Sequence, residues 1–315
     1  MKKYLSLLLT ITFISIFIIY FSKNSEVFSP LLQTSPSILL MIFLLRILML
    51  FVTGIFLKVA LVAFSKHITI FESFKISILS SVGNYFMPFR GGTGIRAVYF
   101  KEKLKISYSY SISSLSGSYV LIFFTNSVIA LLSLTIIHIR TNVYSISLYI
   151  FFLVIFIITL LLFLYKFPEE IFRKKGKSKV LGKLSSIINN VVKGWNFIIC
   201  NKRILLKLLL LTILNFFIVS LITYLEFKTI KVSIPTMNLL LYVCLSSSSL
   251  LISLTPGSIG IKESVLLVFA SIIGITNNHV LQIALIDRGV LFFVLLILYC
   301  LTKIITKSNQ ERNSN

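Results

Sequence analysis

The chain has 315 residues, of which 57% are hydrophobic, and its 31 lysines and arginines against 9 aspartates and glutamates give a formal net charge of +22. So apolar a composition leaves little material for a soluble globular domain, and its three cysteines without paired spacing exclude a disulfide framework. The basic residues cluster between long apolar runs, which indicates the positive-inside pattern of a membrane protein rather than a nucleic-acid-binding surface.

Long apolar runs predict an all-α bundle with about eight membrane-spanning helices, since roughly 20 apolar residues cross a hydrocarbon core of about 30 Å. The first run resembles a signal peptide, but no small-residue cleavage site follows it, so we interpret it as an uncleaved span. The runs are Tyr4–Phe21, Ile38–Leu57, Ser111–Ile137, Val143–Tyr165, Ile204–Leu225, Met237–Leu254 and Ser264–Ile305, the last broken near Thr276–Val280.

The basic loops predict the orientation of the chain in the plasma (inner) membrane. The segments Arg90–Lys105 and Lys166–Arg203 should face the cytoplasm, together with both termini. This orientation requires Phe71–Phe89 to enter and leave on one side, because a full crossing would place the basic loop after it outside. We therefore expect a re-entrant element there, packed in protein or lining a wet cavity.

The domain organisation is expected to be simple. Residues 1–305 form one transmembrane domain, and residues 306–315 form a short polar tail. Within the basic linker 166–203, apolar residues recur at helical spacing between Val180 and Ile199. That pattern fits a helix lying on the inner leaflet and fits equally a connecting helix that packs on the bundle.

Two Gly-rich motifs echo each other in the two halves of the chain. The segments "GGTGIR", Gly91–Arg96, and "GSIGIK", Gly257–Lys262, share the pattern Gly-x-x-Gly-Ile-basic, and Pro88 and Pro256 precede them. Paired Gly/Pro breaks in corresponding halves are the best sequence pointer to the binding site of a transporter. The sequence therefore predicts two broken or re-entrant elements in an internal repeat, parallel or inverted.

The chemistry of such a break favours an anion. A helix that starts within the membrane directs free N–H groups and partial positive charge at a ligand, and glycine allows close approach to the backbone. Arg90 and Arg96 would add charge, and a guanidinium binds two phosphate oxygens at once. The alternative is a basic cytoplasmic loop that serves only topology.

The residues of both motifs resemble the lysylphosphatidylglycerol synthase transmembrane-region family of flippase-like membrane proteins. The first signature is "LSSVGNYFMPFRGGTGIRAVYFKEKLKISYS", and the second runs from "SLTPGSIGIKESVLLVFASIIGIT" to "ALIDRGVLFF". Many members carry Glu after the paired glycines, where this chain has Thr93, so no carboxylate role transfers there. The matching residues are Arg90, Gly91, Gly92, Arg96, Pro256, Gly257, Gly260, Glu263 and Arg288.

The resemblance implies translocation of a lipid or a lipid-linked substrate. In the aminoacylating members a large soluble synthase half follows the membrane part and charges phosphatidylglycerol from aminoacyl-tRNA. Since this chain ends at Asn315, shortly after its last span, we expect no lysyl transfer.

The charged residues of the second half suggest further site residues. We expect Arg288 to converge with Arg90 and Arg96 on a phosphate, while Glu263, beside Lys262, pairs with one of these arginines. The alternative for Asp287 is a structural salt pair with Arg288. Asn84 and Tyr99 flank the first motif as hydrogen-bond donors to a headgroup. No metal-ligand spacing or nucleotide motif occurs, so neither a metal nor a cofactor is expected.

These observations predict a protein that flips an anionic phospholipid or a lipid-linked glycan between leaflets, with membrane lipids rather than nucleic acid as partners. Two alternatives stay open. An intramembrane transferase acting on a lipid carrier would need Glu263 or Asp287 as its base. A non-catalytic subunit of an envelope-assembly complex, or a homo-oligomer, would need only surfaces.

Overall fold

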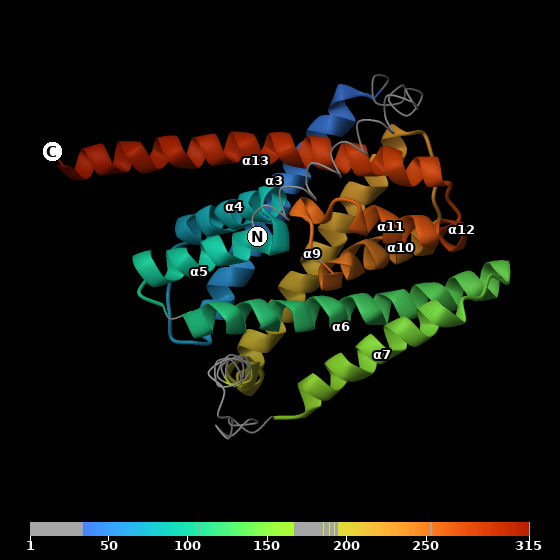
Figure 1. Cartoon of the computed structure of the whole chain (residues 1–315), viewed down its shortest axis with the longest axis horizontal. Coiled ribbons are helices and arrows are strands. Elements are labelled where there is room, and N and C mark those ends of the chain that lie inside the picture. The colour runs from blue at the N-terminus through green and yellow to red at the C-terminus, as the bar shows by residue number, and fades with distance from the viewer. Residues whose placement is uncertain are drawn as a thin grey trace, which may run out of the picture.

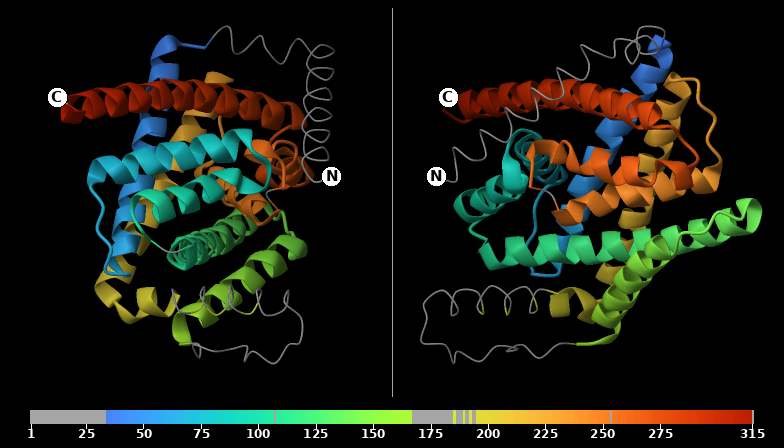
Figure 2. Two further views of the ribbon diagram at one scale, coloured as in Figure 1. Left: turned by 60° about the vertical axis from the view of Figure 1, so that its left-hand side comes forward. Right: turned by 45° about the vertical axis from the view of Figure 1, so that its right-hand side comes forward.

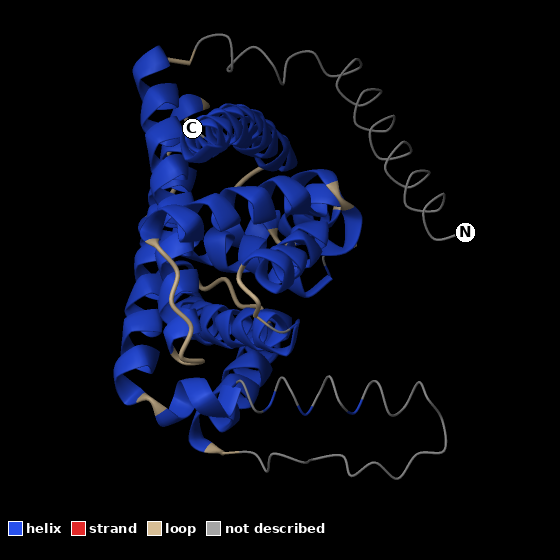
Figure 3. Cartoon of the chain, turned by 90° about the vertical axis from the view of Figure 1, so that its left-hand side faces the viewer, coloured by secondary structure: helices blue, strands red, loops and turns tan. Residues whose placement is uncertain are grey.

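The structure of the protein, a computed structural model, describes residues 34–106, 108–166, 185, 189, 192, 195–252 and 254–314. Every regular element within these ranges is helical (Figure 3). The expected all-α membrane bundle is therefore confirmed.

Five helices in these ranges are long and apolar enough to cross a membrane. A helix of 27 residues spans about 40 Å, more than the hydrocarbon core requires. The five helices coincide with five of the expected apolar runs. The first expected run, Tyr4–Phe21, lies outside the described residues. The five are α3 (Pro36–Val62), α6 (Tyr108–Thr141), α7 (Ile146–Leu164), α9 (Lys202–Thr229) and α13 (Asn277–Ser314).

Two segments that we expected to span are too short. Met237–Leu254 forms α10 (Thr236–Ser248), which has 13 residues, followed by the 3-10 turn η3 (Ser249–Ile252). The block after Ser264 begins inside α11 (Ile261–Val268), which has only 8 residues, before the short helix α12 (Ala270–Ile273). Serine, proline and glycine interrupt the backbone hydrogen bonds here, so apolar composition does not become one continuous helix.

The first half contains a re-entrant element, but with other bounds than expected. Helix α4 (Ile70–Phe86), the turn η2 (Pro88–Arg90) and α5 (Gly91–Lys103) form a helical hairpin that returns to its starting side (Figure 1). Phe71–Phe89 supplies only the first arm and the turn, and the return arm is formed by the basic stretch that we expected to be a cytoplasmic loop. A capping box between Thr69 and Glu72 starts α4, with the Thr69 side chain accepting from the Glu72 N–H at 3.1 Å. Glu72 thus has a structural role at a helix end.

The second half repeats this arrangement in the opposite direction. Helix α10, the turn η4 (Pro256–Ser258) and α11 form a hairpin that opens toward the other end of the molecule, and the two hairpin tips meet in the middle (Figures 1 and 2). The Phe89 N–H donates to the Leu254 carbonyl at 3.2 Å across this junction. Each half therefore reads span, hairpin, span: α3, α4–α5, α6, then α9, α10–α11, α13. The halves form an inverted repeat, the alternative that the motifs alone left open.

The linker helix is described only at its C-terminal end. Residues 195–200 are helical, and Trp195 and Ile198 are buried in a cluster with Phe64 and Leu208. The Trp195 indole donates to the Leu162 carbonyl at 2.8 Å. This end packs on the bundle rather than on lipid, while the remainder of the 166–203 prediction lies largely outside the described residues.

The inverted hairpins predict labelling from opposite faces. In a variant with Cys200, Cys244 and Cys300 replaced by serine, we expect Glu102→Cys, at the open end of α4–α5, to react from one side only. Ser233→Cys, before α10, should react only from the other side, because its hairpin opens the opposite way. A membrane-impermeant maleimide, applied to intact cells and to inverted vesicles, measures this. Reaction of both positions from one side would contradict the inverted arrangement.

Candidate functional site

A cavity of about 430 Å³, with a mostly apolar wall into which polar groups are set, lies between the first hairpin and helices α3, α6, α9 and α10. Its volume lies within the range of roughly 300–1,000 Å³ that is typical of small-ligand pockets. Its wall alternates apolar side chains with hydroxyls, amides and two guanidinium groups. The polar residues in it are Thr53, Ser77, Ser80, Ser81, Asn84, Arg90, Thr93, Arg96, Ser118, Tyr119, Asn126, Thr212, Asn215 and Ser247.

Two arginines of the first motif face this cavity without a carboxylate partner among the described residues. Arg90, in the hairpin tip, lies over the Tyr119 ring at 4.9 Å from its centroid. Arg96, about one and a half turns into α5, donates to the Ser114 hydroxyl at 2.5 Å. A guanidinium keeps its charge at neutral pH. Because neither arginine has a carboxylate partner among the described residues, both can bind an anion in the cavity.

Several polar atoms of the wall are buried and have no hydrogen-bond partner among the described residues. Buried polar groups in native proteins are paired with protein or ordered water in roughly 90% of cases or more, so a group of such atoms around one cavity points to water or a polar ligand in it. The atoms are Arg90 Nη1, Arg96 Nε, Ser80 Oγ, Asn84 Oδ1, Asn126 Nδ2 and Asn215 Oδ1.

Two glycines of the first motif pack against neighbouring backbone and side chains rather than forming the left-handed turn. The left-handed residues of the tip are Phe89 and Arg90, with φ of 52° and 53°, and α5 begins at Gly91. A side chain on Gly92 would meet the Ser80 carbonyl of α4, and one on Gly91 would meet Met87 at 2.5 Å. These glycines let two helices pack closely.

Thr93 and Tyr99 differ in their relation to the cavity. Thr93 lies in the wall, and its hydroxyl donates to the Arg90 carbonyl at 2.9 Å, which ties the hairpin tip to α5. Tyr99 instead packs against the apolar cluster that contains Leu57 and Phe100. The structure therefore gives Tyr99 no contact with the cavity.

The second motif holds charged side chains in place rather than lining the cavity. The Gly257 carbonyl accepts from Arg288 Nη1 at 3.3 Å, and the Gly260 N–H donates to the Glu263 carboxylate at 2.8 Å. Gly257 and Gly260 have φ of 56° and 82°, which side chains rarely adopt, and Pro256 begins the turn. The second break thus fixes the start of α11.

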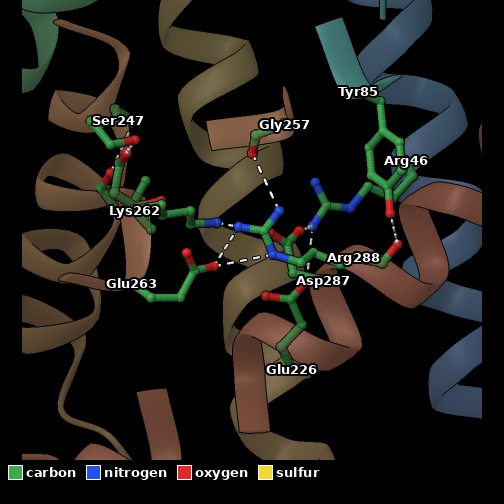
Figure 4. Close-up of polar contacts among 12 residues, drawn as sticks. Arg46, Tyr85, Glu226, Ser247, Gly257, Lys262, Glu263, Asp287 and Arg288 are labelled. Atoms are coloured by element: carbon green, nitrogen blue, oxygen red, sulfur yellow. Dashed lines mark hydrogen bonds and ion pairs between the residues drawn. The ribbon is translucent and has the colours of Figure 1, made fainter. Parts of the chain in front are cut away.

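An ion cluster joins four elements beside the hairpin junction (Figure 4). Arg46 of α3 donates to Glu226 of α9 at 2.9 Å and also pairs with Asp287 of α13. Lys262 of α11 pairs with the other Asp287 oxygen at 2.7 Å. Two cations and two carboxylates meet here, so the group is electrically neutral.

Arg288 belongs to a neighbouring pair. Its guanidinium donates to the Glu263 carboxylate at 2.5 Å, and its backbone carbonyl accepts from the Tyr85 hydroxyl at 3.2 Å (Figure 4). Glu263 thus pairs with an arginine, as expected. The alternative for Asp287, a salt pair with its neighbour Arg288, is wrong, because Asp287 pairs with Arg46 and Lys262. The expected convergence of Arg288 with Arg90 and Arg96 is also wrong, because Arg288 is not among the residues that line the cavity.

Sequence reasoning missed Arg46 and Glu226 of the ion cluster and most polar residues of the cavity wall, among them Asn126 and Asn215. Arg46 and Glu226 interrupt or border apolar runs, and Asn126 and Asn215 lie inside them. A polar or charged residue within a span is by default a functional candidate, so the signal was present. Their partners lie far away in the chain, which only the fold reveals. Within the described ranges no group of His, Cys, Asp and Glu could hold a metal ion.

Comparison with known families agrees with this architecture. The family model described as the lysylphosphatidylglycerol synthase TM region matches residues 5–298. Neither the curated proteins nor the solved structures contain a match to this chain. The match covers nearly the whole chain and both hairpins, so this membrane protein belongs to the lysylphosphatidylglycerol synthase TM region family.

Proposed function

We propose that the protein moves the headgroup of an anionic lipid, or of a lipid-linked glycan, between the two leaflets of the plasma membrane. The observation that carries this proposal is the cavity with Arg90 and Arg96, two cations of the re-entrant hairpin that have no carboxylate partner among the described residues. An unpaired charge at membrane depth costs about 3 kcal/mol or more, and a bound anion would offset that cost.

The inverted repeat supports a transport role. Transporters with inverted repeats bind their substrates between the two halves, and alternating access follows from movement of one half against the other. Here the hairpin tips meet beside the cavity, and the wall combines elements of both halves, α3 to α6 and α9 to α10. The headgroup would enter the polar cavity while the acyl chains remain in the lipid.

The alternative of an intramembrane transferase is less well supported. Its candidate bases, Glu263 and Asp287, are paired with Arg288 and with Arg46 and Lys262, and neither lines the cavity. A carboxylate engaged by cations is a weak proton acceptor. The basic loops favour cytoplasmic termini, and the sequence has no nucleotide motif, so movement would be passive or coupled to an ion gradient.

Reconstitution tests the function. We expect the full chain in proteoliposomes to expose labelled phosphatidylglycerol of the inner leaflet to a membrane-impermeant quencher, without chemical change of the lipid. A new lipid product would support the transferase instead. Neither movement nor product would overturn the proposal and favour an accessory subunit.

Substitution of Arg90 or Arg96 is expected to slow lipid movement. Arg96→Lys keeps the charge but loses the planar fork, so the initial rate should fall about tenfold, and Arg90→Lys should behave likewise. The matched control is Lys103→Arg at the exposed end of α5, which should leave the rate unchanged. Normal rates and normal abundance of both arginine variants would reduce the motif to a topological signal.

A further inference from the structure

Resting on the proposed function, we infer that the cavity selects a headgroup that carries a phosphate and hydroxyl groups but no amine. The description of the family names lysylphosphatidylglycerol. The lysyl ester of this lipid adds two ammonium groups and makes the headgroup cationic. The charges of the wall argue against such a headgroup as the ligand of this cavity.

The first argument is the absence of an ammonium acceptor. Among the residues that the structure describes, the cavity wall contains two arginines and no aspartate or glutamate. Among the described acids, Glu226, Glu263 and Asp287 are already bound by Arg46, Arg288 and Lys262. A headgroup ammonium would therefore meet two like charges and no carboxylate, which disfavours its binding.

An aromatic face is the second way to hold an ammonium group. Three aromatic side chains line the described wall, Phe56, Tyr119 and Phe216. The guanidinium of Arg90 lies over the Tyr119 ring at 4.9 Å from its centroid, so a ligand could use that face only by displacing Arg90. An ammonium group at Phe56 or Phe216 would still lie in a cavity that holds two guanidinium groups and no carboxylate among the described residues.

The unpaired atoms match a phosphate with hydroxyls. Arg90 Nη1, Arg96 Nε and Asn126 Nδ2 are donors, which suits phosphate oxygens. Asn84 Oδ1 and Asn215 Oδ1 are acceptors, which suits the hydroxyl groups of glycerol or of a sugar. A ligand with a phosphate and hydroxyls would satisfy both kinds of atom, and a lipid with a phosphate alone would leave the acceptors unpaired.

Binding to the purified full-length chain in detergent tests this selectivity. The probes are short-chain phosphatidylglycerol, short-chain lysylphosphatidylglycerol and free glycerol 1-phosphate, each titrated while the melting temperature is followed. We expect phosphatidylglycerol to bind at least tenfold more tightly than the lysyl lipid. Arg90→Gln combined with Arg96→Gln should remove that preference. Equal binding, or tighter binding of the lysyl lipid, would overturn the inference.

One substitution should reverse the preference. Asn126 is buried, lies in the wall and has an unpaired Nδ2, so Asn126→Asp places a carboxylate in the cavity with almost no change of shape. We expect it to weaken phosphatidylglycerol binding and to strengthen lysyl-lipid binding, each about tenfold. The control Asn142→Asp makes the same change in an exposed loop and should alter neither. Unchanged selectivity in a folded Asn126→Asp protein would contradict the assignment of the wall.

Free glycerol 1-phosphate, which has the headgroup chemistry without acyl chains, separates this inference from the proposed function. If glycerol 1-phosphate binds as tightly as phosphatidylglycerol, the headgroup chemistry stands and the proposal of lipid movement fails. If phosphatidylglycerol binds selectively but does not move in proteoliposomes, the inference again stands alone. If neither phosphate compound binds, the inference is overturned.

Discussion

Gly92→Ala is expected to remove most of the folded protein. The added methyl group would overlap the Ser80 carbonyl of α4 and lie 2.7 Å from the Asn84 nitrogen. Overpacking typically costs about 1–3 kcal/mol, and here the obstacle is backbone, which yields only if the two helices separate. The loss should therefore reach or exceed that range, and Gly92→Val should be worse. Folded yield after size-exclusion chromatography and the melting temperature in detergent measure it.

Gly94 provides the matched control for Gly92. It lies two residues further along α5, and a methyl group built on it has no heavy atom within 4 Å. Gly94→Ala should fold normally and even gain slightly from the better helix propensity of alanine. If Gly92→Ala folded as well as Gly94→Ala but lost lipid movement, the glycine would serve ligand approach and the packing explanation would be wrong.

Asp287→Asn is expected to lower abundance as much as activity. The wild-type carboxylate pairs with both Arg46 and Lys262, and its loss leaves two cations with Glu226 as their only carboxylate partner among the described residues. Removing one partner of a buried ion pair costs about 3–5 kcal/mol, because the remaining charge stays desolvated. Protein level in membranes and the melting temperature after purification report the loss.

A second substitution tests the electrostatic cause. Lys262→Gln in the Asp287→Asn background removes the surplus cation, leaves Arg46 paired with Glu226, and should restore much of the stability. Glu102→Gln, an exposed charge on α5, should have no effect. A stable, abundant but inactive Asp287→Asn protein would instead give Asp287 a direct part in ion coupling or chemistry.

The charge pattern of the sequence predicted the two hairpins unequally well. The positive-inside rule predicted that Phe71–Phe89 enters and leaves on one side of the membrane. The structure has a hairpin here, but its return arm is α5, which lies in the basic stretch that the rule had assigned to a loop. The same rule gave no signal at Met237–Leu254, since few charges follow that run. The second hairpin was therefore interpreted as spans, and its shortness comes from the helix break at Ser249–Ser258.

Among the described residues, the cavity wall likewise contains predicted site residues of the first motif but none of the second. Arg90, Arg96, Thr93 and Asn84 were predicted from one motif, and all four line the cavity because one hairpin carries them. Residues of the second motif do not join them there. Lys262 corresponds to Arg96 in the repeat, yet it pairs with Asp287, a partner 25 residues away on another helix.

The sequence by itself determined the membrane class, the positions of five spans and the break at Pro88. These follow from hydropathy, charge bias and the positions of proline and glycine, all of which act within one segment. Only the tertiary structure decided which charges are neutralised and which remain open to a ligand. Arg46 meets Glu226 and Asp287 across separations of 180 and 241 residues, and no local pattern encodes such pairs. Arg90 and Arg96, which have no carboxylate partner among the described residues, thereby become the candidate anion site.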